Sequence, residues 1–248
     1  MRFLIYLVSF GAAFRDFTQM ALTSVRQVGK WEHDIAVLSD SDTPFGDSAA
    51  TVINILPDLQ NRYPWFASTT GMRISHFKPE VEYYIDLQQY DYVLYLDSDI
   101  LVNSDRLTDL VSTLCRESRV AVQRDCISVS SGQSFAGGWV LTPEEQRAWG
   151  HYQVNAGILG FPVDSRSRRI LRDWRRMNVA KRFKSRDQGN LIALLLRKYH
   201  GQWSYIEDAG FGRRLQRYPY TFVHFTTHKD EMMGPYYEQI LRLDPLHR

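Results

Sequence analysis

The chain has 248 residues, of which 44% are hydrophobic and 23% charged, and its formal net charge is +2. These values are typical of soluble globular proteins and exclude disordered and fibrous classes. A chain of this length can bury one large core, so we expect a single domain. The two cysteines, Cys115 and Cys126, lack the paired spacing of a zinc site, and we expect both to be reduced.

The first segment, MRFLIYLVSFGAA, has two interpretations. A basic residue, a short apolar run and small residues also occur in signal peptides. The apolar run is short for that role, and an amphipathic helical pattern follows at once in FRDFTQMALTSVRQVG. We therefore predict a first β-strand over Arg2–Val8. No stretch approaches the ~20 apolar residues of a membrane span, so we expect a cytoplasmic protein that at most rests on the inner face of a membrane.

Strand and helix signals alternate through the first half of the chain. The predicted strands are Arg2–Val8, Asp34–Leu38, 51–56, Tyr92–Leu96 and 119–123. The predicted helices are Phe17–Val28, Pro79–Gln89 and 106–117. This alternation predicts an α/β fold with a mostly parallel central sheet flanked by helices. Ligands of such sheets bind outside the carboxyl ends of the strands.

The second half of the chain is less regular. Thr142, followed by Pro143 and Glu145, has the pattern of a capping box and predicts a helix start. We further predict a strand broken by glycines over Val154–Phe161. Helices over 165–177 and 186–199 and a late strand over 220–225 complete the predicted elements. No internal repeat or linker divides the chain.

The segment YDYVLYLDSDILV, Tyr90–Val102, places two carboxylates beside the core. Asp97 and Asp99 follow one apolar run and precede another. On an extended strand they would point to the same side, and burying two unpaired like charges is costly. A divalent cation such as Mg²⁺ or Mn²⁺, which prefers oxygen ligands, would resolve the repulsion. A solvated turn is the ordinary interpretation of such a pair, but the apolar flanks and the strand-end position favour a metal site.

Four segments together resemble the GT-A glycosyltransferases, especially the retaining, family 8-like enzymes typified by glycogenin and bacterial lipopolysaccharide galactosyltransferases. Tyr90–Val102 looks like their D-x-D strand, and VNAGILGF, Val154–Phe161, is similar to their N-[AS]-G strand. RDQGNL at 186–191 resembles their D-Q motif, and FVHF at 222–225 their late histidine strand. The resemblance implies a Rossmann-like single domain. Its nucleotide-binding half would be about 1–125 and its acceptor-binding half about 126–248.

The same resemblance implies a metal-dependent reaction. Mn²⁺ or Mg²⁺ would be held by Asp97, Asp99 and His224, although a histidine between two phenylalanines could also be a core residue. A hexose would pass from a nucleotide-diphosphate sugar, expected to be a UDP-sugar, to a glycan or lipid-linked acceptor with retention of configuration. The departing diphosphate carries concentrated negative charge, which explains the need for a metal.

The resemblance also implies residues that contact the donor. They are expected at the end of the first strand (Val8, Ser9, Phe10), near the phosphates (Lys78, Asp97, Ser98, Lys229) and around the sugar (Asn155, Ala156, Gly157). Three alternatives remain open. Phe10 could belong to the core and Lys78 could be an exposed lysine at a helix start. Lys229 lies one residue short of the family spacing, so His228 could take its role, or neither residue could.

Three polar residues are candidates for the reaction itself. Asp187 and Gln188 resemble the pair that faces the reacting sugar in retaining enzymes, although Asp187 could also be an ordinary helix-capping acid. Asp125 follows a predicted strand and could contact the donor sugar or the acceptor. No residue stands out as the nucleophile of a double displacement, so we expect a front-side displacement that depends on positioning and electrostatics.

A basic segment runs from Arg166 to Arg186, with Asp173 as its one acid before the final arginine. It could be a solvated helix face or a dock for an anionic membrane surface or an acidic glycan; nucleic acid is not the expected partner. Two other functions remain open: a nucleotidyltransferase with the same metal site, and a non-enzymatic domain that binds anionic surfaces or nucleic acid. The aromatic segment at 234–243 could form a membrane-contacting or oligomerising helix, but core packing is favoured.

Overall fold

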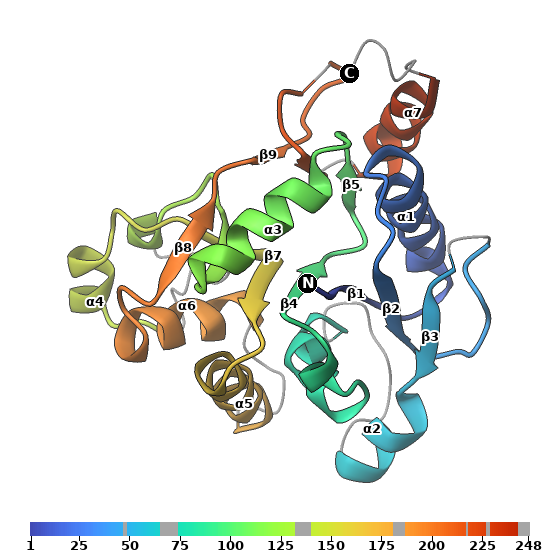
Figure 1. The fold of residues 1–248 in the computed structure, drawn as a ribbon. Coiled ribbons are helices and arrows are strands. Elements are labelled where there is room, and N and C mark those ends of the chain that lie inside the picture. Colours follow the sequence, from blue (N-terminus) through green and yellow to red (C-terminus); the bar gives the residue numbers. More distant parts are fainter. Residues whose placement is uncertain are drawn as a thin grey trace.

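A seven-stranded sheet with the order β3-β2-β1-β4-β7-β6-β8 forms the centre of the protein, seen in a computed structural model (Figure 1). The structure describes residues 1–46, 49–64, 74–131, 140–180, 187–216, 218–226 and 229–242. The strands are β1 (Phe3–Ser9), β2 (Asp34–Ser39), β3 (Thr51–Asn54), β4 (Tyr92–Leu96), β6 (Val120–Arg124), β7 (Val154–Pro162) and β8 (Trp203–Ile206). β7 runs antiparallel to both neighbours, and the other pairs are parallel. The predicted mostly parallel α/β sheet is confirmed.

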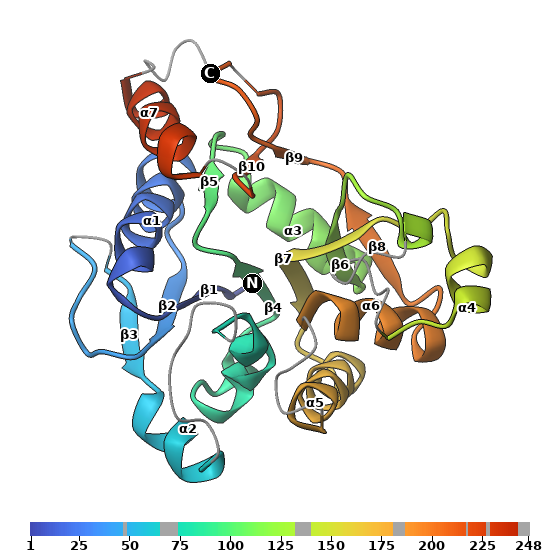
Figure 2. The same ribbon diagram turned by 180° about the vertical axis from the view of Figure 1, so that it is seen from behind.

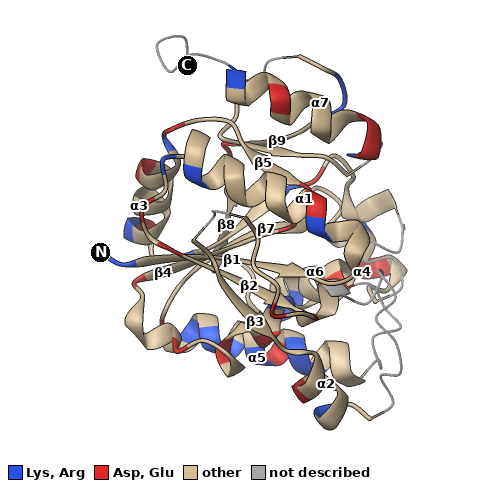
Figure 3. Cartoon of the chain, turned by 90° about the vertical axis from the view of Figure 1, so that its right-hand side faces the viewer, with Lys and Arg blue, Asp and Glu red and all other residues tan. Residues whose placement is uncertain are grey.

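Helices cover both faces of this sheet, as Figure 3 shows from the side. The helices are α1 (Ala12–Thr23, continued by a π-helical turn at Ser24–Val28), α2 (Leu56–Arg62), α3 (Leu107–Glu117), α4 (Pro143–Ala148), α5 (Ser165–Ala180), α6 (Asp187–Lys198) and α7 (Lys229–Arg242). Side chains alternate between the faces of a strand. Accordingly, Ile5 and Leu7 of β1 pack with residues of α1 and α3, whereas Leu4 and Tyr6 pack with residues of α5 and α6.

A second, three-stranded sheet lies beside the first (Figure 2). Its strands are β5 (Ile100–Val102), β10 (Phe222–His224) and β9 (Ala209–Phe211), with β10 in the middle. Val223 and Phe225 pack with Met233 and Tyr236 of α7 in a separate apolar cluster. The described part of the aromatic C-terminal segment therefore belongs to the core. The strand containing His224 was predicted, but β5 and β9 were not.

Four predicted elements need correction. The helix predicted over Phe17–Val28 begins earlier, at Ala12, and its last five residues are π-helical. Pro79–Gln89 is not an α-helix but belongs to two 3₁₀ segments, Ile74–Tyr83 and Leu87–Gln89, consistent with a proline inside the first. β7 is extended over all nine residues, but its pairing with β6 is interrupted: Val122 pairs with Leu159 and the next residue, Gln123, with Asn155, so residues 156–158 of β7, which include Gly157, have no partner in β6. The strand predicted over 51–56 ends at Asn54, and α2 follows.

The predicted start of α4 is confirmed in detail. The Thr142 hydroxyl accepts a hydrogen bond from the Glu145 amide at 3.3 Å, and the Thr142 amide donates to the Glu145 carboxylate at 2.8 Å. Across the described residues, no helix is long and apolar enough to cross a membrane.

Candidate functional site

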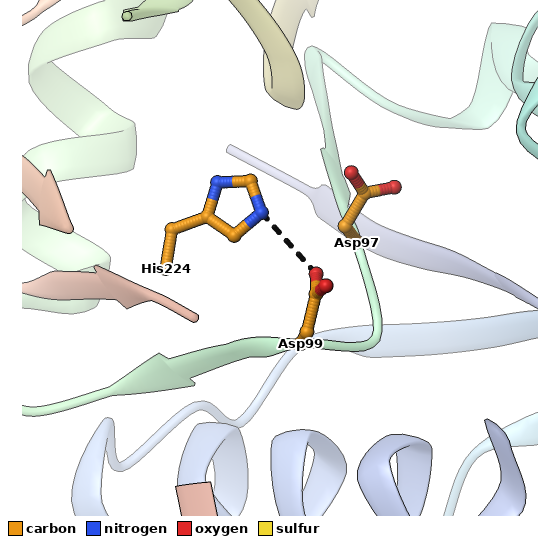
Figure 4. A group of neighbouring side chains, drawn as sticks. All are labelled: Asp97, Asp99 and His224. Carbon is orange, nitrogen blue, oxygen red and sulfur yellow. Dashed lines mark ion pairs between the residues drawn. The ribbon is translucent and has the colours of Figure 1, made fainter. Parts of the chain in front are cut away.

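Asp97 and Asp99 lie in a tight turn that links the two sheets. The Asp97 amide donates to the Gly157 carbonyl at 2.8 Å, and the Ile100 amide donates to the Asp97 carbonyl at 3.2 Å, which turns the chain into β5. The two carboxylates are therefore not on one extended strand, as the sequence argument assumed. They still converge: with His224 they offer three ligand atoms that all lie within 4.8 Å of one another (Figure 4).

The small sheet brings His224 to this turn. His224 pairs with Ile100 across β10 and β5, and the next amide, from Phe225, donates to the Asp99 carbonyl at 2.9 Å. His224 Nε2 then lies 3.2 Å from Asp99 Oδ1, while its Nδ1 lies 2.8 Å from the Gln123 side-chain oxygen. The imidazole is thus fixed at both nitrogens.

Gly157 leaves the space that the His224 ring fills. A β-carbon at position 157 would lie 2.4 Å from His224 Cε1, a distance that real contacts do not reach. The other side of the ring stacks on Phe211, with ring centroids 5.5 Å apart. The sequence argument assigned Gly157 to ligand approach, and in the structure its small size admits the imidazole.

The geometry of His224 and Asp99 suits a shared cation. If the His224 Nδ1–H donates to Gln123, a neutral imidazole turns the Nε2 lone pair toward the Asp99 carboxylate. Two acceptors 3.2 Å apart repel unless a proton or a metal ion lies between them. Burial would raise the pKa of Asp99, but the charges of a protonated His224 and of Lys229 lower it to about 2, and a bound metal ion would take the place of the proton on His224. One nitrogen and two carboxylates form a ligand set that Mn²⁺ or Mg²⁺ can accept.

Lys78 is buried at the centre of the site, with 3% of its side chain exposed. Its Nζ lies 3.0 Å from Asp97 Oδ1, 3.2 Å from Asp187 Oδ2 and 3.0 Å from the Ala156 carbonyl. Burial would lower the pKa of Lys78, but Asp187 and Asp97 raise it above its usual value. The alternative of an exposed lysine at a helix start is wrong.

The site carries more negative than positive charge. Three carboxylates, those of Asp97, Asp99 and Asp187, face only two ammonium groups, those of Lys78 and Lys229. The Lys229 Nζ lies 3.2 Å from Asp99 Oδ2. Burial raises the pKa of Asp97, and Lys78 offsets only part of this effect. Burial would also raise the pKa of Asp187, but Lys78 and His76 lower it. A divalent cation would supply the missing positive charge.

Asp125, Gln188 and Asn155 form a separate polar network beside the ion pairs. Asp125 Oδ2 accepts from Gln188 Nε2 at 3.0 Å and from Asn155 Nδ2 at 3.3 Å. Asp125 Oδ1 accepts from the amides of Cys126 at 2.7 Å and Ile127 at 3.3 Å. The Gln188 oxygen in turn accepts from the Ala156 amide at 3.3 Å. The side-chain amide of Gln188 is therefore held at both ends.

The residues expected to hold the nucleoside have buried side chains. Val8, Ser9 and Phe10 are at most 5% exposed, and the Phe10 ring stacks on Phe77 at 5.9 Å. Ser98 is also buried, between the two aspartates. His228, the alternative to Lys229, and Arg186, the first residue of the D-Q segment, lie outside the described residues.

Two residues of the site, Gln123 and Tyr95, were not predicted from the sequence. Gln123 holds His224, and Tyr95 donates a short hydrogen bond to Asp97. Gln123 could have been noticed as a polar residue near the end of an apolar strand, two residues before Asp125. Tyr95 gave no such signal, because aromatic residues are common in buried strands.

Comparison with known proteins shows the fold. No family model and no curated protein matches the chain. Among solved structures, the galactosyltransferase LgtC in complex with donor and acceptor sugar analogues is similar with a TM-score of 0.61 and 15% identity, over 96% of this chain and 94% of that one. Mouse xyloside xylosyltransferase 1 is similar with a TM-score of 0.62 and 9% sequence identity, over 92% of this chain and 99% of that one. The bifunctional glycosyltransferase WbbM is similar with a TM-score of 0.59 and 13% sequence identity, over 98% of this chain and 50% of that one.

Proposed function

We propose that this protein is a metal-dependent glycosyltransferase that moves a hexose from a UDP-sugar to a glycan or lipid-linked acceptor. The observation that carries the proposal is the convergence of Asp97, Asp99 and His224 at the carboxyl end of β4, next to the buried Lys78–Asp187 pair. The similarity in fold to solved glycosyltransferases supports the same function.

Asp97, Asp99 and His224 would hold Mn²⁺ or Mg²⁺. When bound, such an ion supplies positive charge to the departing diphosphate. Lys229 would also stabilise the negative charge of the departing diphosphate, because its ammonium group lies beside Asp99. The same group is held over the rings of Phe14 and Phe17, at 4.8 and 5.4 Å from their centroids. The nucleoside would lie against the main chain of Val8–Phe10 and Ser98.

Asn155, Ala156, Asp187 and Gln188 would surround the sugar. The ion pair with Lys78 fixes Asp187, and the hydrogen bond to Asp125 fixes Gln188. Both side chains are therefore positioned before a donor binds. Such preorganisation lowers the cost of orienting the sugar.

Retention by front-side displacement is part of the proposal. Within the described part of the chain, each carboxylate of the site already has strong partners: Lys78 for Asp97 and Asp187, His224 and Lys229 for Asp99, and four donors for Asp125. A carboxylate engaged in this way is a poor nucleophile. The departing phosphate would accept the proton of the acceptor hydroxyl. The acceptor would be bound mainly by residues 126–248 and the nucleotide by 1–125.

A panel of nucleotide sugars tests the function. The purified protein is incubated with each donor in Mn²⁺ or in EDTA, and thermal stabilisation, UDP release and the anomeric configuration of any product are measured. We expect one UDP-hexose to raise the melting temperature and release UDP only with metal. Release of UMP instead of UDP would identify cleavage at the other phosphorus, as in a nucleotidyltransferase. Asp109→Asn, on the exposed face of α3, is the control variant. No shift with any nucleotide sugar would refute the proposal.

A further inference from the structure

A cavity of about 440 Å³ lies between α5 and the end of the 3₁₀ segment Ile74–Tyr83. Its lining residues are Glu82, Tyr83, Ser165, Arg168, Arg169 and Arg172. The volume falls within the range of small-molecule sites. A water molecule occupies roughly 30 Å³ of liquid, so the cavity has room for an oxyanion with an organic group attached.

The three arginines give this cavity an excess of positive charge. Arg168 and Arg172 are one helical turn apart, as are Arg169 and Arg172, so all three side chains lie on one side of α5. All three are exposed, and no ion pair joins them to a carboxylate in the described ranges. Figure 3 shows basic residues along this helix.

The one carboxylate in the lining is already neutralised. Glu82 forms an ion pair with Arg175 at 2.8 Å, and both side chains are mostly buried. The Arg175 guanidinium also lies 4.2 Å from the centroid of the Tyr83 ring, and Arg62 lies 4.4 Å from it. Tyr83 is therefore held in place although 54% of it is exposed. The cavity presents a fixed aromatic residue, the Ser165 side chain and three guanidinium groups that form no ion pair within the described ranges.

This arrangement favours a phosphate group over a carboxylate. A guanidinium binds either group through paired hydrogen bonds. A phosphomonoester carries about −1.5 to −2 charges and three acceptor oxygens, so it can engage several guanidinium groups at once. A carboxylate carries one charge and two oxygens.

The cavity is remote from the candidate metal site. Tyr92, at the start of β4, pairs with Pro162 of β7, and α5 begins three residues later. Asp97 follows the other end of β4. Five strand residues separate the two ends by roughly 16 Å at about 3.3 Å per residue. None of the six lining residues belongs to the candidate metal site.

We propose that the cavity lined by Arg168, Arg169 and Arg172 is a binding site for a small molecule that carries a phosphomonoester, such as a sugar phosphate. The basic residues that the sequence argument treated as a solvated face or a surface dock thus form part of a concave site. This proposal does not depend on the glycosyltransferase assignment.

The test is direct binding in EDTA at 150 mM NaCl, measured by calorimetry. The probes are glucose 6-phosphate, inorganic phosphate and glucuronate, which separate an organic phosphomonoester from the free anion and from a carboxylate. We expect glucose 6-phosphate to bind most tightly and glucuronate most weakly. The double variant Arg169→Gln/Arg172→Gln should weaken glucose 6-phosphate binding by at least about ten-fold, because each charged hydrogen-bond partner contributes about a factor of ten.

The control is Arg116→Gln/Arg119→Gln, which removes the same charge at the end of α3, on the opposite face of the central sheet from α5. It should change the dissociation constant less than about two-fold, since exposed charges at a distance are screened by salt. Equal losses in the two double variants would show non-specific attraction and overturn the proposal. Equal affinity for glucuronate, or binding of the wild-type protein to anionic vesicles but not to soluble phosphates, would also overturn it. Melting temperatures confirm that each variant folds.

Discussion

The imidazole of His224 lies directly against the α-carbon of Gly157, so closely that a β-carbon there would come within 2.4 Å of the ring. The two residues belong to different sheets, β10 in the small one and β7 in the large one. The shape of the candidate metal site therefore depends on a residue that offers no ligand atom from its side chain.

Gly157→Ala should displace His224 and weaken metal binding. Phe211 stacks on the ring and Gln123 holds its Nδ1, so the ring cannot move aside without losing a partner. We expect Mn²⁺ affinity to fall by about ten-fold or more, the loss typical of disturbed ligand orientation. Calorimetry with Mn²⁺ measures it. Gly234→Ala, in α7, where no atom lies within 4 Å of an added β-carbon, should bind Mn²⁺ like the wild type.

Asp99→Asn should abolish Mn²⁺ binding and leave the fold intact. The substitution removes a charged ligand that His224 and Lys229 keep ionised, but it preserves the size of the side chain. Electron paramagnetic resonance of free Mn²⁺, with circular dichroism as the check on folding, measures both effects. Asp109→Asn serves as the matched control on the surface of α3. Unchanged metal affinity in Asp99→Asn would refute the ligand assignment.

Gln123→Leu should lower Mn²⁺ affinity by about 10- to 100-fold, since it removes the acceptor that orients His224. Gln123→Glu keeps an acceptor at the same position and should retain tight binding. Competition with a metal-sensitive dye measures the Mn²⁺ affinity of both variants. Comparable loss in both variants would mean that Gln123 acts through packing and not through its hydrogen bond.

Lys78→Met should destabilise the metal-free protein by about 3–5 kcal/mol, because it leaves Asp97 and Asp187 without their shared cation. Urea unfolding in EDTA measures the loss. Mn²⁺ should recover part of it, since an ion beside Asp97 replaces some of the missing charge. The double variant Lys78→Met/Asp187→Asn should lose less unfolding free energy than the two single variants lose together. Strictly additive losses would contradict a direct interaction between Lys78 and Asp187.

Asp173→Asn should reveal a pH-dependent contact between α5 and α6. Burial would raise the pKa of Asp173, but Lys198 and Tyr199, which both donate to its carboxylate, lower it below the usual value. A carboxylate whose pKa is lower in the folded state stabilises the fold. Its full contribution is present above the unfolded-state pKa of about 3.9 and is lost as the pH falls through the folded-state pKa. The stability difference from wild type should thus be constant between pH 7 and 5 and shrink below pH 4 in urea titrations. A difference that grows toward low pH would contradict this.

The sequence predicted the elements whose signal is local. The apolar runs that became β1, β2 and β4 were long enough to identify, and the Thr142 capping box marked α4 correctly. The pair Asp97 and Asp99 was predicted to hold a metal ion because charge so near the core needs compensation, and the structure places both beside His224.

The features that depend on distant partners could not be predicted in this way. The burial of Lys78 follows from Asp187 on another helix, and nothing in HFKPEV indicates it. β5 and β9 are three residues long, too short to show a period of two. The role of Gln123 follows from the register of β6 beside β7 and from the position of His224, which are properties of the assembled fold.

The connection between the two sheets has a consequence for protein synthesis. Asp97 and Asp99 emerge from the ribosome well before β10 and Lys229, which follow them in the chain. Until β10 docks beside β5, the nascent chain has two aspartates without the histidine and the lysine that accompany them in the finished molecule. The candidate metal site can therefore form only after β10 has been synthesised and has docked beside β5.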